Sequence, residues 1–182
     1  MVDNLSPYTA DILICLERLN MSYTCKKFYE ISDYNNDSFE KIILSGRSKP
    51  TRESNIANSK IILNCKRGTP ILGICYGAEI MALALGGSIR RMKSPVREMT
   101  RVLLSESAEV YSMFPKHSVF YVYESHAYCV AKIPERFVSI ATSQYCKNEI
   151  FIHPMKKMVG VQFHPEKSGD DGLTLLSNFL RM

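Results

Sequence analysis

Short apolar runs alternate with helical segments along the first half of the chain. Residues 41–44 form an apolar run, residues 57–65 carry apolar side chains at helical spacing, and residues 70–74 form a second apolar run. Residues 76–85 then have the Ala, Leu and Met content of a helix. Because such alternation is typical of parallel β-α-β units, we predict an α/β fold: an open, mostly parallel sheet with helices on both faces.

Helical segments also stand near both ends of the chain. Ser6 and Pro7 are typical of a helix start, and apolar side chains recur at spacings of three and four through residues 8–19. A last helix is predicted at residues 171–180. The second half is richer in strands, which we expect to extend the sheet in antiparallel fashion. These strands are predicted at residues 101–104, 119–123, 137–141, 149–152 and 158–163.

Composition is that of an ordinary folded domain. The chain has 182 residues, 46% hydrophobic and 23% charged, so we expect one domain over residues 1–182. No apolar stretch is long enough to span a membrane, and no basic flank precedes an apolar leader; a cytoplasmic location is therefore expected. Six cysteines without a Cys-x-x-Cys pair predict reduced thiols and no structural zinc.

Positive charge is concentrated in one part of the chain. Twelve basic and three acidic side chains lie within residues 41–101, a local charge of +9 that leaves −4 for the rest of a chain whose total is +5. This segment is either a docking face for an acidic partner or a set of solvated side chains. No motif or aromatic pattern indicates nucleic-acid binding.

A glycine-flanked cysteine stands between the second apolar run and the helix that follows it. Gly73 and Gly77 lie two residues before and after Cys75, which suits a sharp strand-to-helix turn that exposes a nucleophile. At a helix N-terminus we expect the thiol pKa to be lowered, and the N–H of Tyr76 to be available for an oxyanion. The alternative is an ordinary glycine-flanked turn.

Of the four histidines, His164 is the candidate base. It ends the apolar run 159–163, so it reaches the same sheet edge as the cysteine, and Glu166 is placed to hold its second nitrogen. His117 in a polar loop and His153 before a proline are expected to be structural or superficial. Without the cysteine, His164 and Glu166 would be interpreted as the end of a capped strand and a surface glutamate.

Residues 72–77 and 160–166 resemble the two signature motifs of class I glutamine amidotransferases. The likeness extends over nearly the whole chain. The centre, residues 73–87, is most like the glutaminase of GMP synthases. The opening is similar to the anthranilate synthase glutaminase, and the tail to that of imidazole glycerol phosphate synthase.

The resemblance implies hydrolysis of the glutamine side-chain amide and supply of ammonia to a separate synthetase, best matched by a GMP synthase, with no cofactor or metal. Cys75 would be the nucleophile, His164 the base and Glu166 its orienting group. Tyr76, Gly46 and Arg47 would form the oxyanion hole. Residues contacting glutamine would be Glu79, Ser125, His126, Ala127 and Tyr128. The use of His126 as a second base is a lesser alternative.

The sequence departs from the family pattern at three places. Glu79 stands where the family usually has glutamine, Arg47 stands where a second glycine is common, and only Met1 and Val2 represent the first strand, which is expected to be truncated. Two alternatives stay open: a γ-glutamyl amide or peptide hydrolase, or a weakly active regulatory module. A synthetase partner would dock on a basic face made of Arg47, Lys49, Arg52, Arg90 and Arg91.

Overall fold

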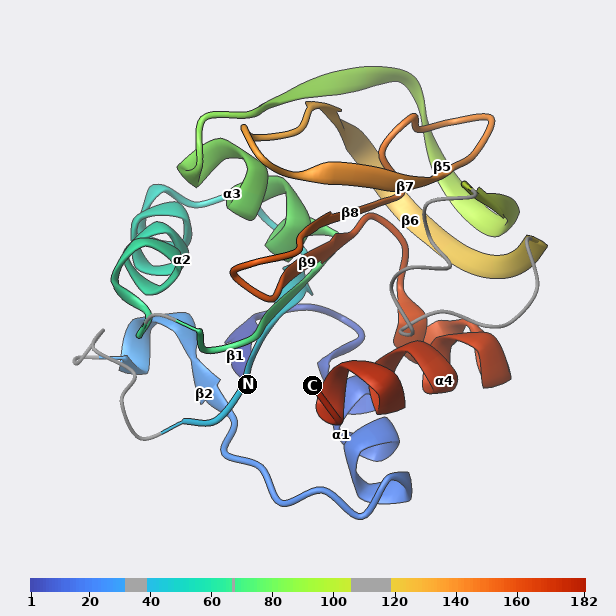
Figure 1. Ribbon diagram of the computed structural model, residues 1–182. Coiled ribbons are helices and arrows are strands. Elements are labelled where there is room, and N and C mark those ends of the chain that lie inside the picture. The colour runs from blue at the N-terminus through green and yellow to red at the C-terminus, as the bar shows by residue number, and fades with distance from the viewer. Residues whose placement is uncertain (32–38, 67, 106–118) are drawn as a thin grey trace.

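The computed structural model describes residues 1–31, 39–66, 68–105 and 119–182 (Figure 1). Its helices are α1 (Thr9–Arg18), α2 (Arg52–Asn64), α3 (Tyr76–Ala84) and α4 (Gly169–Leu180), with short 3-10 turns η1 (Phe28–Glu30) and η3 (Pro165–Lys167). Its strands are β1 (Val2–Asn4), β2 (Lys26–Lys27), β3 (Ile42–Arg47), β4 (Ile71–Ile74), β5 (Ser88–Leu104), β6 (Val119–Lys132), β7 (Val138–Thr142), β8 (Ile150–His153) and β9 (Met158–Val161).

One open sheet joins these strands in the order β2-β1-β3-β4-β9-β8-β7-β5-β6. The strands from β2 to β9 in that order pair in parallel. The pairings from β9 to β6 are all antiparallel. The predicted α/β class, with a parallel sheet and an antiparallel extension, is confirmed.

Helices cover both faces of the parallel half, as predicted (Figure 1). One core contains buried side chains of α1 and α4, such as Ile12 and Phe179, packed with Leu72 and Val161 of the sheet. A second core joins α2 and α3 to the opposite face. The 3.6-residue spacing of apolar side chains makes each helix bury one side against the sheet. As a result, β4 and β9 are neighbouring central strands whose carboxyl ends lie at the same edge.

The antiparallel ribbon of β5 and β6 is longer than the sequence predicts. Residues 101–104 and 119–123 are the predicted strands here, whereas β5 begins at Ser88 and β6 runs to Lys132. The two strands pair over almost their whole length, with an irregularity between Arg91 and Val96. Exposed and charged positions dominate β5, so its sequence lacks the apolar alternation that indicates a strand.

The first strand is short but fully integrated into the sheet. β1 pairs in parallel with β2 on one side and with β3 on the other. Its Asn4 side chain donates to the Ser45 carbonyl and accepts from Asn58 of α2, which ties the strand to its neighbours. Across the described ranges, no helix is long and apolar enough to cross a membrane.

Candidate active site

Cys75 occupies a strained turn between β4 and α3. Its φ of 50° and ψ of −105° are unusual for a residue with a side chain. A Cβ on Gly73 would lie 2.5 Å from the carbonyl carbon and oxygen of Gly77, and one on Gly77 would meet the carbonyl oxygen of Leu44. Both glycines therefore permit close backbone approaches that a side chain would block.

The ionisation state of Cys75 differs from the expectation. The side chain is only 7% exposed, and burial raises the pKa of the thiol well above its ordinary value. The carboxylates of Glu79, Glu124 and Glu166 raise this pKa further, while the backbone N–H of Tyr76 opposes them. The predicted lowering of the pKa by the helix N-terminus is wrong, because burial and three nearby carboxylates outweigh one backbone dipole. The resting thiol keeps its proton and requires a base.

His164 and Glu166 form a buried pair next to this turn. The imidazole Nδ1 lies 2.7 Å from Glu166 Oε1, and both side chains are almost fully enclosed. The His164 backbone is also fixed, since its N–H donates to the Tyr123 carbonyl and its own carbonyl accepts from Ser168 Oγ. With Nδ1 engaged by a carboxylate, Nε2 is the ring nitrogen left for a reacting group.

Gly46 at the end of β3 brings the cysteine and the histidine together. A Cβ built on Gly46 would lie 3.0 Å from His164 Cε1 and 3.8 Å from Cys75 Cβ. All three residues therefore border the same small volume at the carboxyl ends of β3, β4 and β9. Any larger side chain at residue 46 would push against the imidazole.

Arg47 lies across this site. Its guanidinium stacks on the Tyr76 ring at 3.8 Å from the centroid, and its Nη1 donates to Asn55 Oδ1, which also accepts from the Tyr76 hydroxyl. Arg47 continues strand β3 and is not among the residues with positive φ. The Arg47 side chain is therefore held by contacts within the site and is not free on the surface. In this it differs from the other basic residues proposed for docking.

Glu79 is buried in the first turn of α3, one turn after Cys75. Its Oε1 accepts a hydrogen bond from Gln162 Nε2 at 3.3 Å, and Gln162 Oε1 accepts from the Val130 backbone N–H. Burial raises the pKa of Glu79, and the positive charge of Arg47 opposes this shift. The carboxyl group is thus held by the residue that directly follows β9, close to the cysteine turn.

The segment Ser125 to Tyr128 lies in β6 and is divided between two environments. The Ser125 carbonyl is 3.9 Å from Cys75 Sγ, so this residue borders the thiol. Ala127 is half-buried and Tyr128 is exposed. The His126 imidazole is buried, with Nε2 at 2.8 Å from Glu124 Oε2 and Nδ1 at 2.7 Å from the Tyr128 carbonyl. Because both of its ring nitrogens are engaged, His126 has none left to act as a second base.

Two features around the site were not found from the sequence. Tyr8 packs its ring edge-to-face against His164, with centroids 4.7 Å apart. Glu124 and Glu149 form a buried carboxyl pair, in which burial raises the pKa of Glu124 to about 8 and that of Glu149 well above its ordinary value. The sequence offered one signal for this pair: Glu124 directly follows the predicted strand at residues 119–123, and a glutamate in a strand is rarely buried without a partner.

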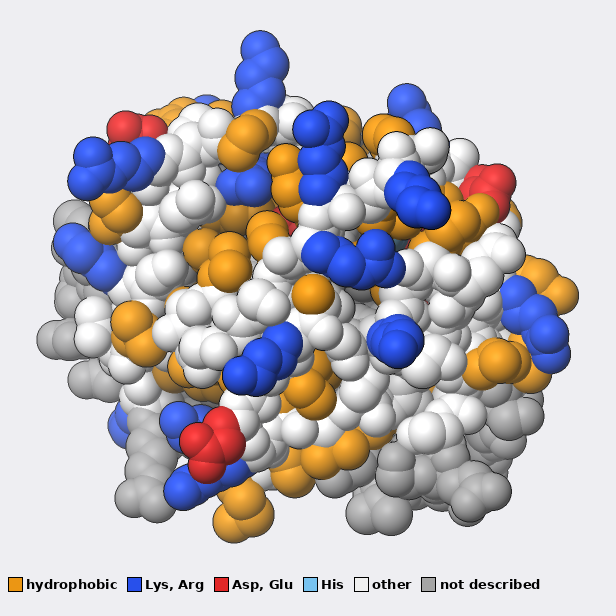
Figure 2. Space-filling model, turned by 90° about the horizontal axis from the view of Figure 1, so that it is seen from above, with side chains coloured by type: hydrophobic (Ala, Val, Ile, Leu, Met, Phe, Trp, Pro, Cys, Tyr) orange, Lys and Arg blue, Asp and Glu red, His pale blue; other side chains and the backbone are white. Residues whose placement is uncertain are grey.

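The remaining predicted residues lie on the surface or outside the described ranges. Lys49, Arg52, Arg90 and Arg91 are exposed, and Arg90 Nη2 donates to the Tyr145 carbonyl. Figure 2 looks down on the side crossed by β5, where Lys and Arg side chains are prominent and acidic ones are few. His117 falls in a range that the structure does not describe.

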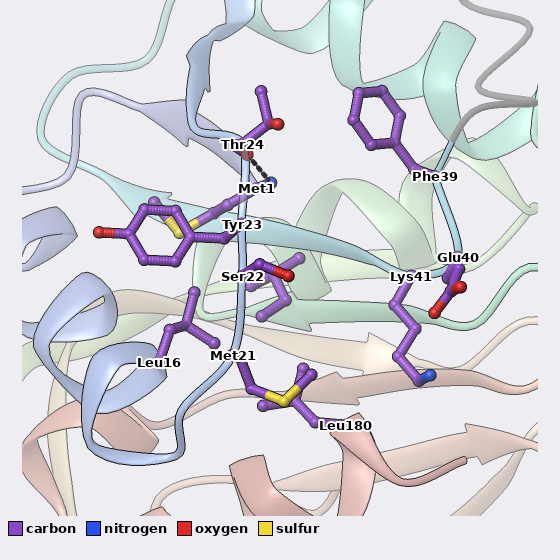
Figure 3. A pocket seen from close by; sticks show the side chains of 11 residues that line it. Met1, Leu16, Met21, Ser22, Tyr23, Thr24, Phe39, Glu40, Lys41 and Leu180 are labelled. Atoms are coloured by element: carbon purple, nitrogen blue, oxygen red, sulfur yellow. Dashed lines mark hydrogen bonds between the residues drawn. The ribbon is translucent and has the colours of Figure 1, made fainter.

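A cavity of about 400 Å³ lies at the opposite end of the sheet (Figure 3). Its lining includes Met1, Lys41, Ile43 and Leu180, which lie at the amino ends of β1 and β3 and at the end of α4. This cavity is separate from the cysteine turn. No group of three or more metal-ligating side chains occurs in the part of the chain that the structure describes.

Comparison with known proteins identifies the family of this chain. The family model described as glutamine amidotransferase class-I matches residues 1–182. The chain is 35% identical over 148 residues to one subunit of a glutamine-hydrolysing GMP synthase from Methanocaldococcus jannaschii, covering 81% of this chain and 76% of that protein. The corresponding subunit from Methanococcus aeolicus is 36% identical, with the same coverage.

A solved structure from Thermoplasma acidophilum, ascribed to the same GMP synthase subunit, superposes with a TM-score of 0.87 at 27% identity. It covers 99% of this chain, which covers 90% of that structure. A glutamine amidotransferase from Thermotoga maritima has the same fold, with a TM-score of 0.73 at 20% identity; the two superpose over 93% of this chain and 90% of that one. Since the family match spans all of its residues, the chain belongs to the class-I glutamine amidotransferase family.

Proposed function

We propose that this chain hydrolyses the side-chain amide of glutamine and supplies the ammonia to a separate synthetase of the GMP synthase type. The observation that carries the proposal is the strained Cys75 turn, which borders Gly46 together with His164, the partner of Glu166. Family membership and the GMP synthase relatives support the same reaction and the same kind of partner. We place this activity in the cytoplasm.

The proposed reaction uses the chain's own residues and one water molecule. The thiol proton of Cys75 moves to Nε2 of His164 as Sγ attacks the amide carbon. The imidazolium then gives this proton to the leaving nitrogen, and ammonia departs. Water, activated by the same imidazole, hydrolyses the thioester to glutamate. Because the resting thiol is protonated, Glu166 has to stabilise the imidazolium as the thiolate forms.

The tetrahedral oxyanion needs backbone donors. The N–H of Tyr76 already interacts with the Cys75 sulfur and opens helix α3, where the first N–H groups lack partners. We assign a second donor to the Gly46–Arg47 peptide, next to which both reacting side chains lie. The Arg47 guanidinium, stacked on Tyr76, keeps these two backbone segments together.

Glutamine would be held by the end that carries its α-amino and α-carboxylate groups. We propose that Glu79 pairs with the substrate ammonium and that Ser125, His126, Ala127 and Tyr128 contact the substrate through their backbone. The carbonyl of Ser125 beside the Cys75 sulfur supports this placement. The buried, doubly bonded imidazole of His126 favours a structural role for that side chain.

Glutamate release from glutamine tests the proposal directly. The wild-type chain and the Cys75→Ala and His164→Ala variants should be assayed by themselves and with a GMP synthase-type ATP-dependent partner. We expect release by the wild type, and loss of at least about 1000-fold in either variant without unfolding. Full activity in a His164 variant would refute the assignment of the base.

A γ-glutamyl amide or peptide hydrolase is the second candidate, and Glu79 is the observation that favours it. An ionised carboxylate accepts hydrogen bonds but does not donate them, unlike the amide that the family usually has at this position. The natural substrate of this chain need not therefore be free glutamine. Turnover of γ-glutamyl peptides but not of glutamine, with and without the synthetase, would support this candidate over the first. Absence of both activities would leave a regulatory module.

We propose that the synthetase docks on the exposed basic residues Lys49, Arg52, Arg90 and Arg91, whereas Arg47 serves the site itself. Charge reversal of Arg90 and Arg91 should weaken the complex and reduce its salt dependence, because complementary charge steers association. Titration of the complex by fluorescence anisotropy at low and high salt measures both effects. An unchanged salt dependence would exclude this face.

A further inference from the structure

Tyr8 contacts the candidate base without belonging to the family motifs described above. It stands at the N-terminal boundary of α1, far from His164 in the sequence. Its ring centroid lies 4.7 Å from that of the imidazole at an interplanar angle of 70°. Such edge-to-face contacts have a preferred geometry, so the phenol restrains the tilt of the imidazole.

This restraint complements the other contacts of His164. Glu166 holds Nδ1, and the backbone is bonded to Tyr123 and Ser168. A single hydrogen bond at Nδ1 selects the tautomer but leaves the ring free to rock about that bond. The Tyr8 ring packs edge-to-face against the imidazole and therefore opposes this rocking motion.

The hydroxyl group of Tyr8 reaches a different part of the site. It donates to Ser125 Oγ at 3.2 Å and lies 3.5 Å from the Tyr123 hydroxyl, which accepts from Arg97 Nε at 3.2 Å. Ser125 is the residue whose carbonyl borders the Cys75 sulfur. The phenol therefore joins α1 to the segment of β6 next to the thiol.

We propose that Tyr8 is a positioning residue with two separable tasks: its ring orients the His164 imidazole, and its hydroxyl fixes Ser125 where the substrate binds. The inference rests on the proposed function, since it requires His164 as the base and the Ser125 segment as a glutamine contact. The two tasks predict different kinetic effects. Loss of the ring lowers kcat, whereas loss of the hydroxyl alone raises KM.

Steady-state glutaminase kinetics of two substitutions separate these tasks. Tyr8→Phe keeps the ring, so kcat should stay within about twofold while KM rises by about 3- to 10-fold, the range of one neutral hydrogen bond. Tyr8→Leu removes the ring as well, so kcat should also fall by about 3- to 10-fold, the range of one aromatic pair.

A double-mutant cycle checks the hydroxyl contact. Ser125→Ala removes the acceptor, so it should raise KM as Tyr8→Phe does, and the double variant should be no worse than either single one. Tyr23→Phe is the matched control, because that hydroxyl bonds Glu17 on the surface; both kinetic constants should be unchanged. Equal losses of kcat in Tyr8→Phe and Tyr8→Leu, or no effect of either, would overturn the proposal.

Alkylation of Cys75 by iodoacetamide as a function of pH gives a readout that needs no glutamine. If the ring orients His164, Tyr8→Leu shifts this profile from that of the wild type, whereas Tyr8→Phe, which keeps the ring, retains the wild-type profile. An active wild type whose alkylation profile is the same in Tyr8→Leu would refute the inference and leave the proposed function standing. A shifted profile in a chain that hydrolyses no glutamine, by itself or with the synthetase, would refute the proposed function and support the positioning role.

Discussion

Replacing Glu166 with glutamine tests whether a buried carboxylate stabilises His164 during the reaction. The substitution keeps the shape of the side chain and removes its charge. Glu166 Oε1 lies 2.7 Å from His164 Nδ1, and neither side chain is appreciably exposed to water. Glu166 Oε2 is buried and has no hydrogen-bond partner within the described ranges, so the amide nitrogen of glutamine displaces no existing bond there.

The expected loss follows from the charge and the distance. Charge centres about 4 Å apart attract by about 4 kcal/mol at an effective dielectric constant of about 20. Glutamine keeps a neutral hydrogen bond worth about 1 kcal/mol, which leaves a net loss of about 3 kcal/mol or about 150-fold in kcat. Glu166 also raises the pKa of Cys75, so its removal makes the thiol easier to ionise and offsets part of this loss. We therefore expect a decrease of about 30- to 150-fold.

Coupled measurement of glutamate formation at saturating glutamine gives kcat for the variant. Urea denaturation shows whether its stability is retained, and Glu135→Gln provides a matched control, since Glu135 is exposed and its partner is the exposed Arg136. A decrease of less than about threefold with intact folding would show that the electrostatic reasoning is wrong. His164→Ala should cost more, because it removes the base itself.

Three further predictions concern the thiol, the buried acids and the turn. A glutamine-analogue chloroketone should label Cys75 alone among the six cysteines, as read by peptide mass spectrometry, and labelling of other cysteines would count against the site. Because burial raises the pKa of Glu124 from 4.5 to about 8, the folded state holds a proton that the unfolded chain loses, so stability should fall as pH rises between these values. Glu124→Gln should flatten this decline, and denaturation midpoints at about pH 5 and pH 8 measure it. Gly77→Ala should cost roughly 2–4 kcal/mol of stability by chemical denaturation, because its Cβ meets the Leu44 carbonyl, whereas Gly86→Ala, with open space around it but a φ of +92°, should cost only about 1 kcal/mol.

Much of the architecture near the site was predictable from local patterns. The two apolar runs, the helix after Cys75 and the positions of His164 and Glu166 in the chain are local features, and the structure has strands and a helix at these places. The flanking glycines were interpretable because steric exclusion at a tight turn depends on a few neighbouring backbone atoms.

The long β5–β6 ribbon was not predictable in the same way. Side chains on both faces are exposed over much of β5, so neither an alternation of apolar and polar residues nor an apolar run marks the strand. Most of its hydrogen bonds come from pairing with β6, and its last residues pair with β7, so the partners lie outside the segment itself. The segment with Ser125 and His126 therefore appeared only as motif residues, without the strand that positions them.

The sequence by itself determined that a cysteine lies at a strand-to-helix turn and that a histidine with a nearby glutamate ends a central strand, because periodicity, sterics and motif order are properties of short segments. Only the tertiary structure decided how these groups ionise and what restrains them. The protonated Cys75 thiol, the stacking of Arg47 on Tyr76 and the packing of Tyr8 on His164 all depend on residues far apart in the chain. Burial and electrostatic interactions act through space, so they become known only when the fold brings those residues together.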